Sequence, residues 1–246
     1  MTLPQRLLAA CGVATITAAL CVRPPFAVVR LLARRMTDIV FYADTTLPLI
    51  ALSLDDGPDP ELTPQILDVL ARHRAHATFF VLGHRAATHP DVLNRITGAG
   101  HELGNHGWDA TPAWTMGADQ LEASMRRTAA VLEPLGASRL FRPGSGWIPR
   151  RRRSRIAALG YRCVLGSVYP QDGAILWPQY AVWDVLRRAQ PGAIIVLHEG
   201  RPDRGAVVAT LERILTGLRR RGYTATTVSA LLDAGISRPT ANPVGR

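Results

Sequence analysis

The chain of 246 residues has no lysine, few cysteines and few aromatic residues. Each of these shortages limits the classes of function that the sequence allows. Arginine carries all of the fixed positive charge, and the formal net charge is +10. The three cysteines, Cys11, Cys21 and Cys163, lack the spacing of a zinc knuckle or a disulfide framework. No nucleic-acid motif and no basic stripe interleaved with aromatics is present, which argues against nucleic acid as a partner. A basic protein is drawn instead to anionic surfaces such as membranes or acidic polysaccharides.

Long hydrophobic runs are also scarce. The N-terminal apolar stretch covers residues 7–22, which is shorter than the roughly 20 residues that a membrane-spanning helix needs. It suits the core of a signal peptide, although no small-x-small cleavage site follows it. Residues 26–36 mix aliphatic residues with Arg30, Arg34 and Arg35, a pattern typical of an interfacial helix on anionic lipid. We therefore expect residues 1–36 to act as a signal-anchor or interfacial segment and to associate with a membrane.

The rest of the chain alternates apolar, strand-like runs with helix-like segments. Residues 49–54 and 77–82 have the composition of strands, and residues 64–73 and 116–135 that of helices. This alternation predicts a parallel sheet or barrel covered by helices, with the active site at the carboxyl ends of the strands. The length suits one such domain, placed at residues 37–236. The tail, residues 237–246, is predicted to be disordered.

The most informative motif ends the first long strand, where Asp55 and Asp56 precede Gly57 and Pro58. Two carboxylates at the end of a buried strand lose hydration and repel each other, so a cation or a proton must offset the cost. Neighbouring strand residues point in opposite directions, so the arrangement of this pair depends on the turn that follows. The motif suggests one carboxylate that holds a metal and a neighbour that acts as a base. The alternative is a Gly-Pro turn that simply ends an ordinary strand.

Four further segments follow in order, and each is an apolar strand that ends in polar residues. They cover residues 100–106, 140–147, 163–172 and 193–199. With these five motifs in this order, the sequence over roughly residues 39–232 resembles the polysaccharide deacetylase family, also called the NodB-homology or carbohydrate esterase family 4 domain. The resemblance implies an α/β fold, a distorted barrel of about seven strands, and its motifs fall at strand ends, where such barrels carry their active sites.

The resemblance also implies a reaction, in which water attacks an amide carbonyl with the help of a divalent metal. The metal polarises the carbonyl and lowers the pKa of bound water. By this resemblance, Asp55 is the base and Asp56 is a metal ligand. His106 matches a second metal ligand, and Arg142 matches the arginine that orients the base.

The remaining family roles fall on the last three motifs. His198 matches the general acid that protonates the leaving amine, and Asp172 matches the carboxylate that raises the pKa of this histidine. The backbone N–H of Ser145 is implied to bind the oxyanion, with Gly146 allowing the close approach.

The metal-binding motif departs from the family pattern. The usual set is one aspartate and two histidines spaced i and i+4, but Ala110 stands four residues after His106. Asp109 lies one position earlier and could still reach the metal, because residues three and four apart share a face of a helical turn. A set of Asp56, His106 and Asp109 would be a harder site, for which zinc is expected first and manganese, cobalt or nickel are alternatives. The other interpretation is that Asp109 only caps the turn before Pro112.

The fourth motif, residues 163–172, also departs from the family pattern. Tyr169 stands where the family has an aspartate, and Gly173 stands where it has a tryptophan. These changes bear on the substrate more than on the reaction, and Tyr169 is a candidate for remodelling the substrate pocket. Of the other histidines nearby in sequence, we expect His101 to support its strand and His84 to lie at the rim of the site.

Taken together, these features imply a metal-dependent hydrolase that removes an N-acetyl group from an amino sugar or an N-acetylated polysaccharide. The alternative is a catalytically inactive carbohydrate-binding protein of the same fold. Two arguments on location conflict. The segment after the apolar run contains more arginines than the segment before it, which would place the domain on the cytoplasmic side of a membrane. The family, however, more often works outside the cell. Export, membrane association and the cytoplasmic face all stay open.

Overall fold

The computed structural model describes residues 24–172, 177–199 and 204–236 of a chain that divides into two units, Met1–Thr37 and Asp38–Arg246. The first unit contributes helix α2 (Phe26–Arg35). No helix within the described ranges is long and apolar enough to cross a membrane. Most of the predicted N-terminal segment and the whole of the predicted tail lie outside the described residues, so the predicted domain organisation stays a prediction.

The second unit is built on a parallel sheet of eight strands in the order β1-β6-β5-β4-β3-β2-β7, with β8 paired to β2. A single bridge joins Tyr42, after β1, to Ala193, which directly precedes β7, and another joins Val168, after β6, to Ile195 of β7. They bring the two ends of the sheet together in the manner of a distorted barrel. The strands are β1 (Ile39–Val40), β2 (Leu49–Gly57), β3 (Thr78–Val81), β4 (Glu102–Asn105), β5 (Leu140–Phe141), β6 (Arg162–Val164), β7 (Ile194–His198) and β8 (Thr224–Thr226).

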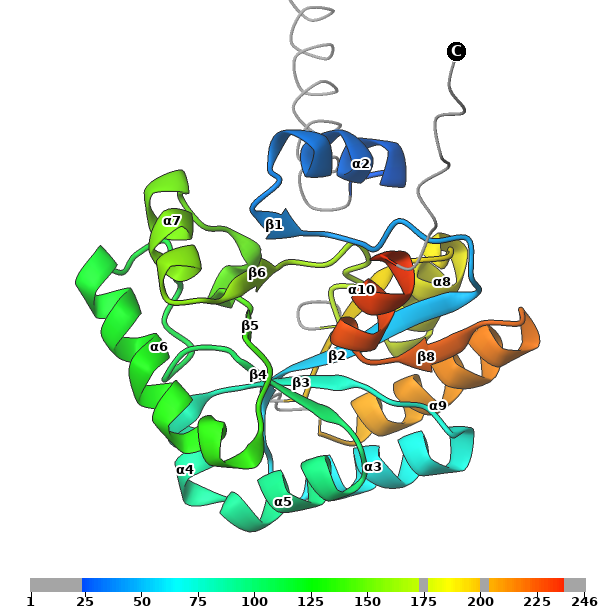
Figure 1. The fold of residues 1–246 in the computed structure, drawn as a ribbon. Helices are drawn as coiled ribbons and strands as arrows, with labels where there is room; N and C mark the ends of the chain where they lie inside the picture. Colours follow the sequence, from blue (N-terminus) through cyan, green and yellow to red (C-terminus); the bar gives the residue numbers. More distant parts are fainter. Residues whose placement is uncertain (1–23, 173–176, 200–203, 237–246) are drawn as a thin grey trace, which may run out of the picture. The chain divides into compact units, whose positions relative to one another are not determined.

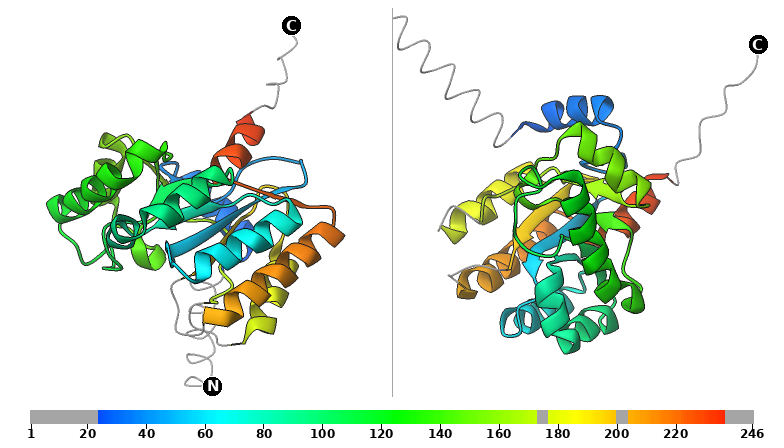
Figure 2. Two further views of the ribbon diagram at one scale, coloured as in Figure 1. Left: turned by 90° about the horizontal axis from the view of Figure 1, so that it is seen from below. Right: turned by 90° about the vertical axis from the view of Figure 1, so that its left-hand side faces the viewer.

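Helices cover the outside of this sheet (Figure 1). They are α3 (Leu62–His73), α4 (Gly83–Thr88), α5 (Pro90–Gly98), α6 (Ala118–Leu132), α7 (Arg150–Ala158), α8 (Pro178–Arg188) and α9 (Arg204–Arg220). Helix α10 (Val228–Ile236) packs instead on the other face of the sheet, against Ala51 of β2. Neighbouring helices contact one another in the order α7, α6, α4, α5, α3, α9 and α8. Figure 2 shows α3 and α9 side by side along the sheet.

Strand β2 separates two hydrophobic cores. Leu52 and Leu54 pack in a cluster with residues of α3 and α9, whereas Ala51 packs in a second cluster with residues of α10. Because side chains alternate along a strand, Ser53 and Asp55 lie on the same face as Ala51, opposite Leu52 and Leu54. The strand thus directs a hydroxyl and a carboxylate into the interior, toward its own carboxyl end.

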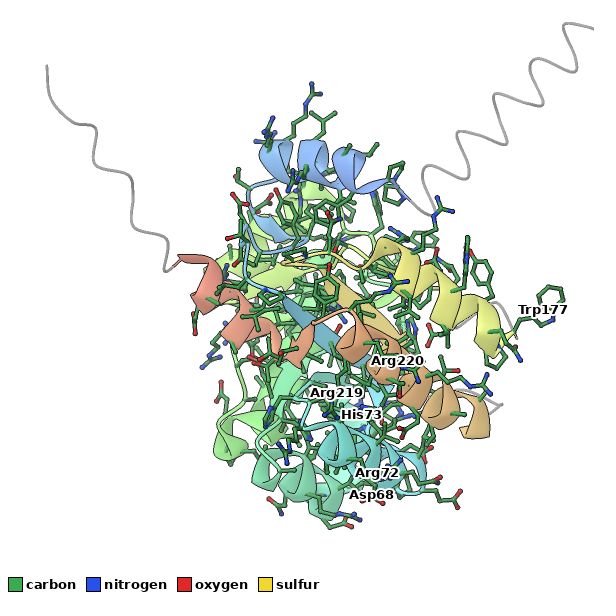
Figure 3. The ribbon with its side chains drawn as sticks, turned by 90° about the vertical axis from the view of Figure 1, so that its right-hand side faces the viewer. Asp68, Arg72, His73, Trp177, Arg219 and Arg220 are labelled. Atoms are coloured by element: carbon green, nitrogen blue, oxygen red, sulfur yellow. The ribbon has the colours of Figure 1, made fainter. Side chains whose placement is uncertain are left out.

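Basic side chains gather at the carboxyl ends of two neighbouring helices. Arg72 and His73 lie in the last turn of α3, and Arg219 and Arg220 lie in the last turn of α9 (Figure 3). Glu212 of α9 joins the two helices, since its carboxylate lies 2.8 Å from Arg72 Nη2 and 2.5 Å from His73 Nε2. Cations in these positions stabilise the helix macrodipole, so part of the net charge supports the fold.

Candidate active site

The carboxyl end of β2 carries the paired aspartates. The parallel pairing of β2 with β7 places Asp55 level with His198, and the pairing of β2 with β3 changes register between Asp55 and Gly57. At this irregularity Asp56 has φ 72°, in the left-handed region that residues other than glycine rarely adopt. The alternation of the strand is broken there, and the Asp56 carboxylate faces His106.

Asp55 is buried and paired with a buried arginine. Arg142 Nη1 lies 2.6 Å from Asp55 Oδ1 and 2.7 Å from Ser53 Oγ. Arg142 Nε also donates to the carbonyl of Val164 over 3.2 Å, and the guanidinium lies 4.0 Å above the ring of Phe80. The guanidinium is therefore held on several sides. It orients Asp55 and supplies the counter-charge that a buried carboxylate needs.

His106 faces the second aspartate. Its Nδ1 lies 2.8 Å from the carbonyl oxygen of Arg142, which can only accept, so Nδ1 carries the hydrogen. Nε2 then points toward Asp56 Oδ1, 3.4 Å away. Burial opposes the ionisation of Asp56, but the hydrogen bond and charge of His106, with the charges of His198 and Arg85, outweigh burial and lower its pKa to about 2. A carboxylate beside an imidazole whose other nitrogen is anchored is a donor pair suited to a divalent ion.

Asp109 does not join this pair. Its side chain is exposed, and its Oδ1 accepts the N–H of Thr111 over 3.0 Å. Hydrogen bonds from Thr111 also lower the pKa of Asp109. Within the part of the chain that the structure describes, no three His, Cys, Asp or Glu side chains gather closely enough to hold a metal. The structure thus brings Asp56 and His106 together and leaves Asp109 as the cap of its own turn.

His198 ends β7 and is paired with Asp172. Its Nδ1 lies 2.9 Å from Asp172 Oδ1, and its backbone N–H donates to Oδ2 over 2.8 Å. Burial disfavours the charged ring, but the hydrogen bond and charge of Asp172, aided by Asp55 and Asp56, raise the pKa of His198 to about 9. The ring is therefore protonated at neutral pH and can donate a proton to a bound molecule.

The residues predicted to contact substrate occupy different surroundings. Ser145 and Gly146 lie in an exposed turn after β5, with φ 67° and 65°. Tyr169 is turned inward, where its hydroxyl donates to the carbonyl of Leu165 and burial raises its pKa. The turn of Ser145 and Gly146 is open to a ligand, whereas the hydroxyl of Tyr169 is engaged within the protein.

Two residues beside the aspartates were not predicted from the sequence. Ser53 bonds to Arg142, and its position two residues before Asp55 on the same strand face was the signal that could have identified it. Glu199 directly follows His198 and is completely buried, and burial raises the pKa of its carboxyl group to about 8. Its sequence position has no feature that distinguishes it from other polar residues at strand ends.

Two other histidines, His101 and His84, lie near these motifs in the sequence. The Nδ1 atom of His101 accepts the N–H of Ala77 over 3.3 Å, which confirms that His101 supports its strand. Burial, and then the charge of His76, lower the pKa of His101 to about 4. His84 is exposed, and its Nδ1 lies 2.8 Å from the carbonyl oxygen of Trp108, close to the metal-binding motif.

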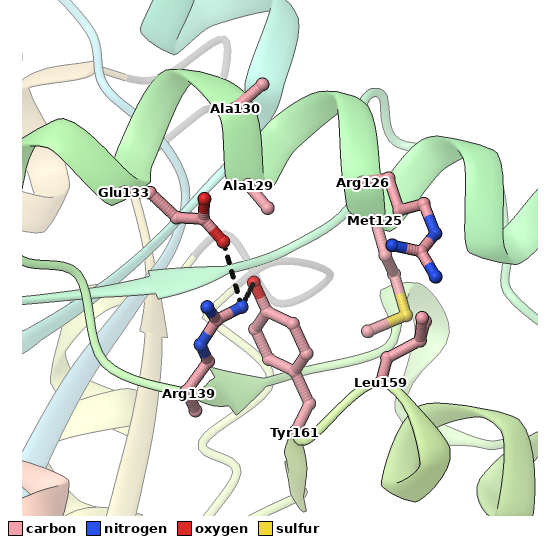
Figure 4. A pocket seen from close by; sticks show the side chains of 8 residues that line it. All are labelled: Met125, Arg126, Ala129, Ala130, Glu133, Arg139, Leu159 and Tyr161. Carbon is pink, nitrogen blue, oxygen red and sulfur yellow. Dashed lines mark hydrogen bonds and ion pairs between the residues drawn. The ribbon is translucent and has the colours of Figure 1, made fainter.

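A cavity of about 170 Å³ lies away from the paired aspartates (Figure 4). It is lined by α6 and by Arg139 and Tyr161, which directly precede β5 and β6. Arg139 Nη1 bonds to Glu133 over 2.9 Å and to the hydroxyl of Tyr161 over 3.5 Å. This cavity borders the amino ends of the strands, at the opposite end of the sheet from Asp55.

Comparison with known proteins agrees with the geometry. Residues 43–164 match the family model described as polysaccharide deacetylase. Over 191 residues the chain is 38% identical to a peptidoglycan-N-acetylglucosamine deacetylase of Bacillus cereus, an alignment that covers 75% of this chain and 88% of that protein. Over 200 residues it is 36% identical to a chitooligosaccharide deacetylase of Sinorhizobium fredii, covering 73% of this chain and 89% of the relative.

Solved structures confirm the predicted NodB-like α/β fold. The crystal structure of the Bc1960 peptidoglycan N-acetylglucosamine deacetylase superposes with a TM-score of 0.75 at 28% identity, covering 80% of this chain and 93% of that chain. A protein described as a family pseudoenzyme from Bacillus anthracis has a TM-score of 0.73 at 23% identity, over 80% of this chain and 69% of that chain, a likeness of fold alone. The named relatives are deacetylases, hydrolases of carbon–nitrogen bonds, and the chain belongs to the polysaccharide deacetylase family.

Proposed function

We propose that this chain is a metal-dependent deacetylase that removes the N-acetyl group from an amino sugar within a glycan. The observation that supports this most strongly is the convergence of three polar pairs at the carboxyl ends of the strands. They are Asp55 with Arg142, Asp56 with His106, and His198 with Asp172. These pairs supply a base, a cation site and an acid within one short stretch of the sheet.

Asp55 is the base in this proposal. One of its oxygens is held by Arg142 at 2.6 Å, and the carboxylate accepts a proton from the attacking water. Arg142 is itself held by Ser53 and by the Val164 carbonyl, so the base has a defined orientation before substrate binds. Such preorganisation lowers the cost of aligning the reacting groups.

His198 is the acid. Its pKa of about 9 keeps the ring protonated at neutral pH, and Asp172 holds Nδ1, which leaves Nε2 to protonate the departing amine nitrogen. An exposed turn at Ser145 and Gly146 is the proposed site for the carbonyl oxygen, which becomes an oxyanion during the attack.

Asp56 and His106 are the proposed metal ligands. Their donor atoms, a carboxylate oxygen and an imidazole nitrogen, suit zinc, and also manganese, cobalt or nickel. When bound, such an ion polarises the amide carbonyl and lowers the pKa of water. Asp109 is the proposed third ligand, and to serve it must exchange its hydrogen bond to Thr111 for the ion.

The proposed substrate follows from the relatives' names, which specify peptidoglycan-N-acetylglucosamine and chitooligosaccharides. Both contain N-acetylglucosamine, so an N-acetylglucosamine oligomer is the first substrate to test. Incubating the full-length chain with Mn²⁺ and N-acetylglucosamine tetramer should produce acetate and free amine in equal amounts. The Asp55→Asn variant, which keeps the volume of the side chain, should produce neither.

The second candidate is a catalytically inactive carbohydrate-binding protein. The position of Asp109 favours it, because only two of the three proposed ligands lie together. In this case the tetramer would bind with the same affinity to the parent chain and to the Asp55→Asn variant, and neither would release acetate with any of the four metals.

We also propose that the N-terminal segment associates with anionic membrane surfaces. Helix α2 is amphipathic in composition, with Arg34 and Arg35 in its last turn. Vesicles with and without anionic lipid, mixed with the full-length chain and with a chain lacking residues 1–36, test this directly. Equal flotation of both chains with anionic vesicles would contradict the proposal.

A further inference from the structure

Glu199 is a fully buried carboxyl group that the mechanism above does not use. It follows His198 at the end of β7, and its exposed fraction is 0%. Oε1 has no hydrogen-bond partner among the described residues. Burying a carboxyl group costs free energy that an apolar side chain of similar volume would not incur, so its presence needs a specific explanation.

Contacts of Glu199 converge on the turn that carries the aspartates. Its backbone N–H donates to the carbonyl of Asp55 over 3.0 Å. Oε2 accepts the hydroxyl hydrogen of Thr63 over 2.7 Å, and Thr63 Oγ1 accepts the N–H of Asp59 over 2.9 Å. Oε1 fills the space beside Gly57, where an added Cβ would lie only 1.5 Å from it. One residue and its hydroxyl partner therefore meet the turn at its start, middle and end.

The turn held in this way contains a strained residue. Asp56 has φ 72° although it carries a side chain, and such a conformation persists only where the surrounding structure enforces it. In this conformation its carboxylate lies 3.4 Å from His106. Gly57 directly follows Asp56, so a change in the backbone of Gly57 beside the Glu199 carboxyl would alter the conformation of Asp56.

We propose that Glu199 is a positioning residue: with Thr63, it holds residues 55–59 in the conformation that directs the Asp56 carboxylate toward His106. The role of this pair as metal ligands rests on the proposed function, but the positioning itself does not. The proposal explains why glycine occupies position 57, since any side chain there would displace the Glu199 carboxyl.

The first test combines crystal structures with Mn²⁺ binding to the full-length chain. Glu199→Gln keeps the shape of the side chain and should preserve both the φ of Asp56 and the affinity for Mn²⁺. Glu199→Ala should let Asp56 leave the left-handed region, separate it from His106, and weaken Mn²⁺ binding by about 10- to 100-fold, as is typical when a residue that orients a metal ligand is removed. A Glu199→Ala structure with Asp56 unmoved, and with unchanged affinity, would overturn the proposal.

A steric double-variant cycle supplies the matched control. Gly57→Ala alone should weaken Mn²⁺ binding, because the new methyl group meets Glu199 Oε1. In the Glu199→Ala background the same methyl group enters vacated space, so the double variant should bind Mn²⁺ at least as well as Glu199→Ala alone. If the losses of Mn²⁺ binding free energy in the two single variants simply add in the double variant, direct contact between positions 57 and 199 is contradicted.

Two further measurements separate a failure of the positioning role of Glu199 from misfolding and from a failure of the metal site. If Glu199→Ala folds poorly by thermal unfolding, Thr63→Val removes the same hydroxyl contact and should displace Asp59 and the turn in the crystal. If the parent chain binds neither Mn²⁺ nor Zn²⁺, cobalt or nickel, the proposed metal site fails. In that case, the crystal structures still decide whether Glu199 holds Asp56 in place.

Discussion

Arg142 and Asp55 form an ion pair of 2.6 Å in the interior of the protein, where both side chains are almost inaccessible to water. The carbonyl oxygen of the same arginine anchors His106 Nδ1 at 2.8 Å. One residue therefore orients the proposed base with its side chain and a proposed metal ligand with its backbone. This coupling makes Arg142 the most informative single position for substitution.

Replacing Arg142 with Met should destabilise the fold as well as abolish activity. The substitution leaves a buried carboxylate without its partner, and removing one member of a buried pair costs about 3–5 kcal/mol of unfolding free energy. Denaturant unfolding measures this directly. The double variant Arg142→Met with Asp55→Asn removes both charges and should recover part of the loss. Equal stability of the single variant and the parent would show that the pair is not buried in solution.

The pH dependence of activity should reveal the pair of His198 and Asp172. The pKa of His198 is raised from 6.5 to about 9, so a reaction that needs its protonated ring should persist to about pH 9 and decline above it. Asp172→Asn removes the charge that raises this pKa and should move the decline to lower pH. A profile of kcat/KM against pH for both chains tests this, and a decline that does not move would contradict the assignment.

The pair of His198 and Asp172 should also make the stability of the folded chain depend on pH in a defined direction. Because the folded-state pKa of His198 lies above its ordinary value of 6.5, the pair stabilises the folded chain fully below that pH. The contribution is lost as the pH rises through about 9. The difference in unfolding free energy between the parent chain and Asp172→Asn should therefore shrink between pH 6 and pH 10, with Asp184→Asn, at a buried aspartate of α8, as a control.

Position 110 offers a gain-of-function test of the metal site. Ala110→His places an imidazole four residues after His106 and should tighten Zn²⁺ binding because it adds a ligand. Ala110→Gln is the polar control and should not. In the parent chain, Asp109→Ala separates the two readings of that residue: weaker binding identifies a ligand, and unchanged binding identifies a turn cap. Calorimetric titration with Zn²⁺ measures all three.

Cys163 should be chemically inert while the chain is folded. The thiol is buried in β6, and burial raises its pKa to about 12, so almost no reactive thiolate exists at neutral pH. In a chain with Cys11→Ser and Cys21→Ser, a thiol reagent should label Cys163 only as fast as the protein unfolds. Rapid labelling under native conditions would show that β6 opens far more readily than its packing indicates.

The alternation of strand-like and helix-like segments predicted a parallel α/β architecture, and the resemblance of the strand-end motifs to the polysaccharide deacetylase family implied the NodB-like fold. Strand-like runs that alternate with helical segments favour a parallel sheet, and the carboxyl ends of its strands carry the pairs formed by Asp55, Asp56, His106, Arg142, Asp172 and His198. The directions of side chains in loops were not predictable in the same way. Asp109 could face a metal or its own turn, and only the hydrogen bond to Thr111 distinguishes these arrangements.

The surroundings of two polar residues within the motifs, Tyr169 and Glu199, were also not predictable from the sequence. The inward orientation of Tyr169 depends on the Leu165 carbonyl, and the burial of Glu199 depends on the backbone of Gly57 and on Thr63. The contacts of Glu199 join segments far apart in the chain, whereas Tyr169 bonds to a carbonyl only four residues before it. No local pattern records the contacts of Glu199, because they depend on the three-dimensional packing of several elements.

The most direct test of the account is acetate release from N-acetylglucosamine tetramer by the chelator-treated full-length chain, before and after a divalent ion is restored. We predict that chelation abolishes release, that Mn²⁺ or Zn²⁺ restores it in the parent chain, and that neither ion restores it in His106→Ala. Full activity after chelation, or no acetate with any divalent ion, would contradict the central claim that Asp56 and His106 support a metal-dependent deacetylation.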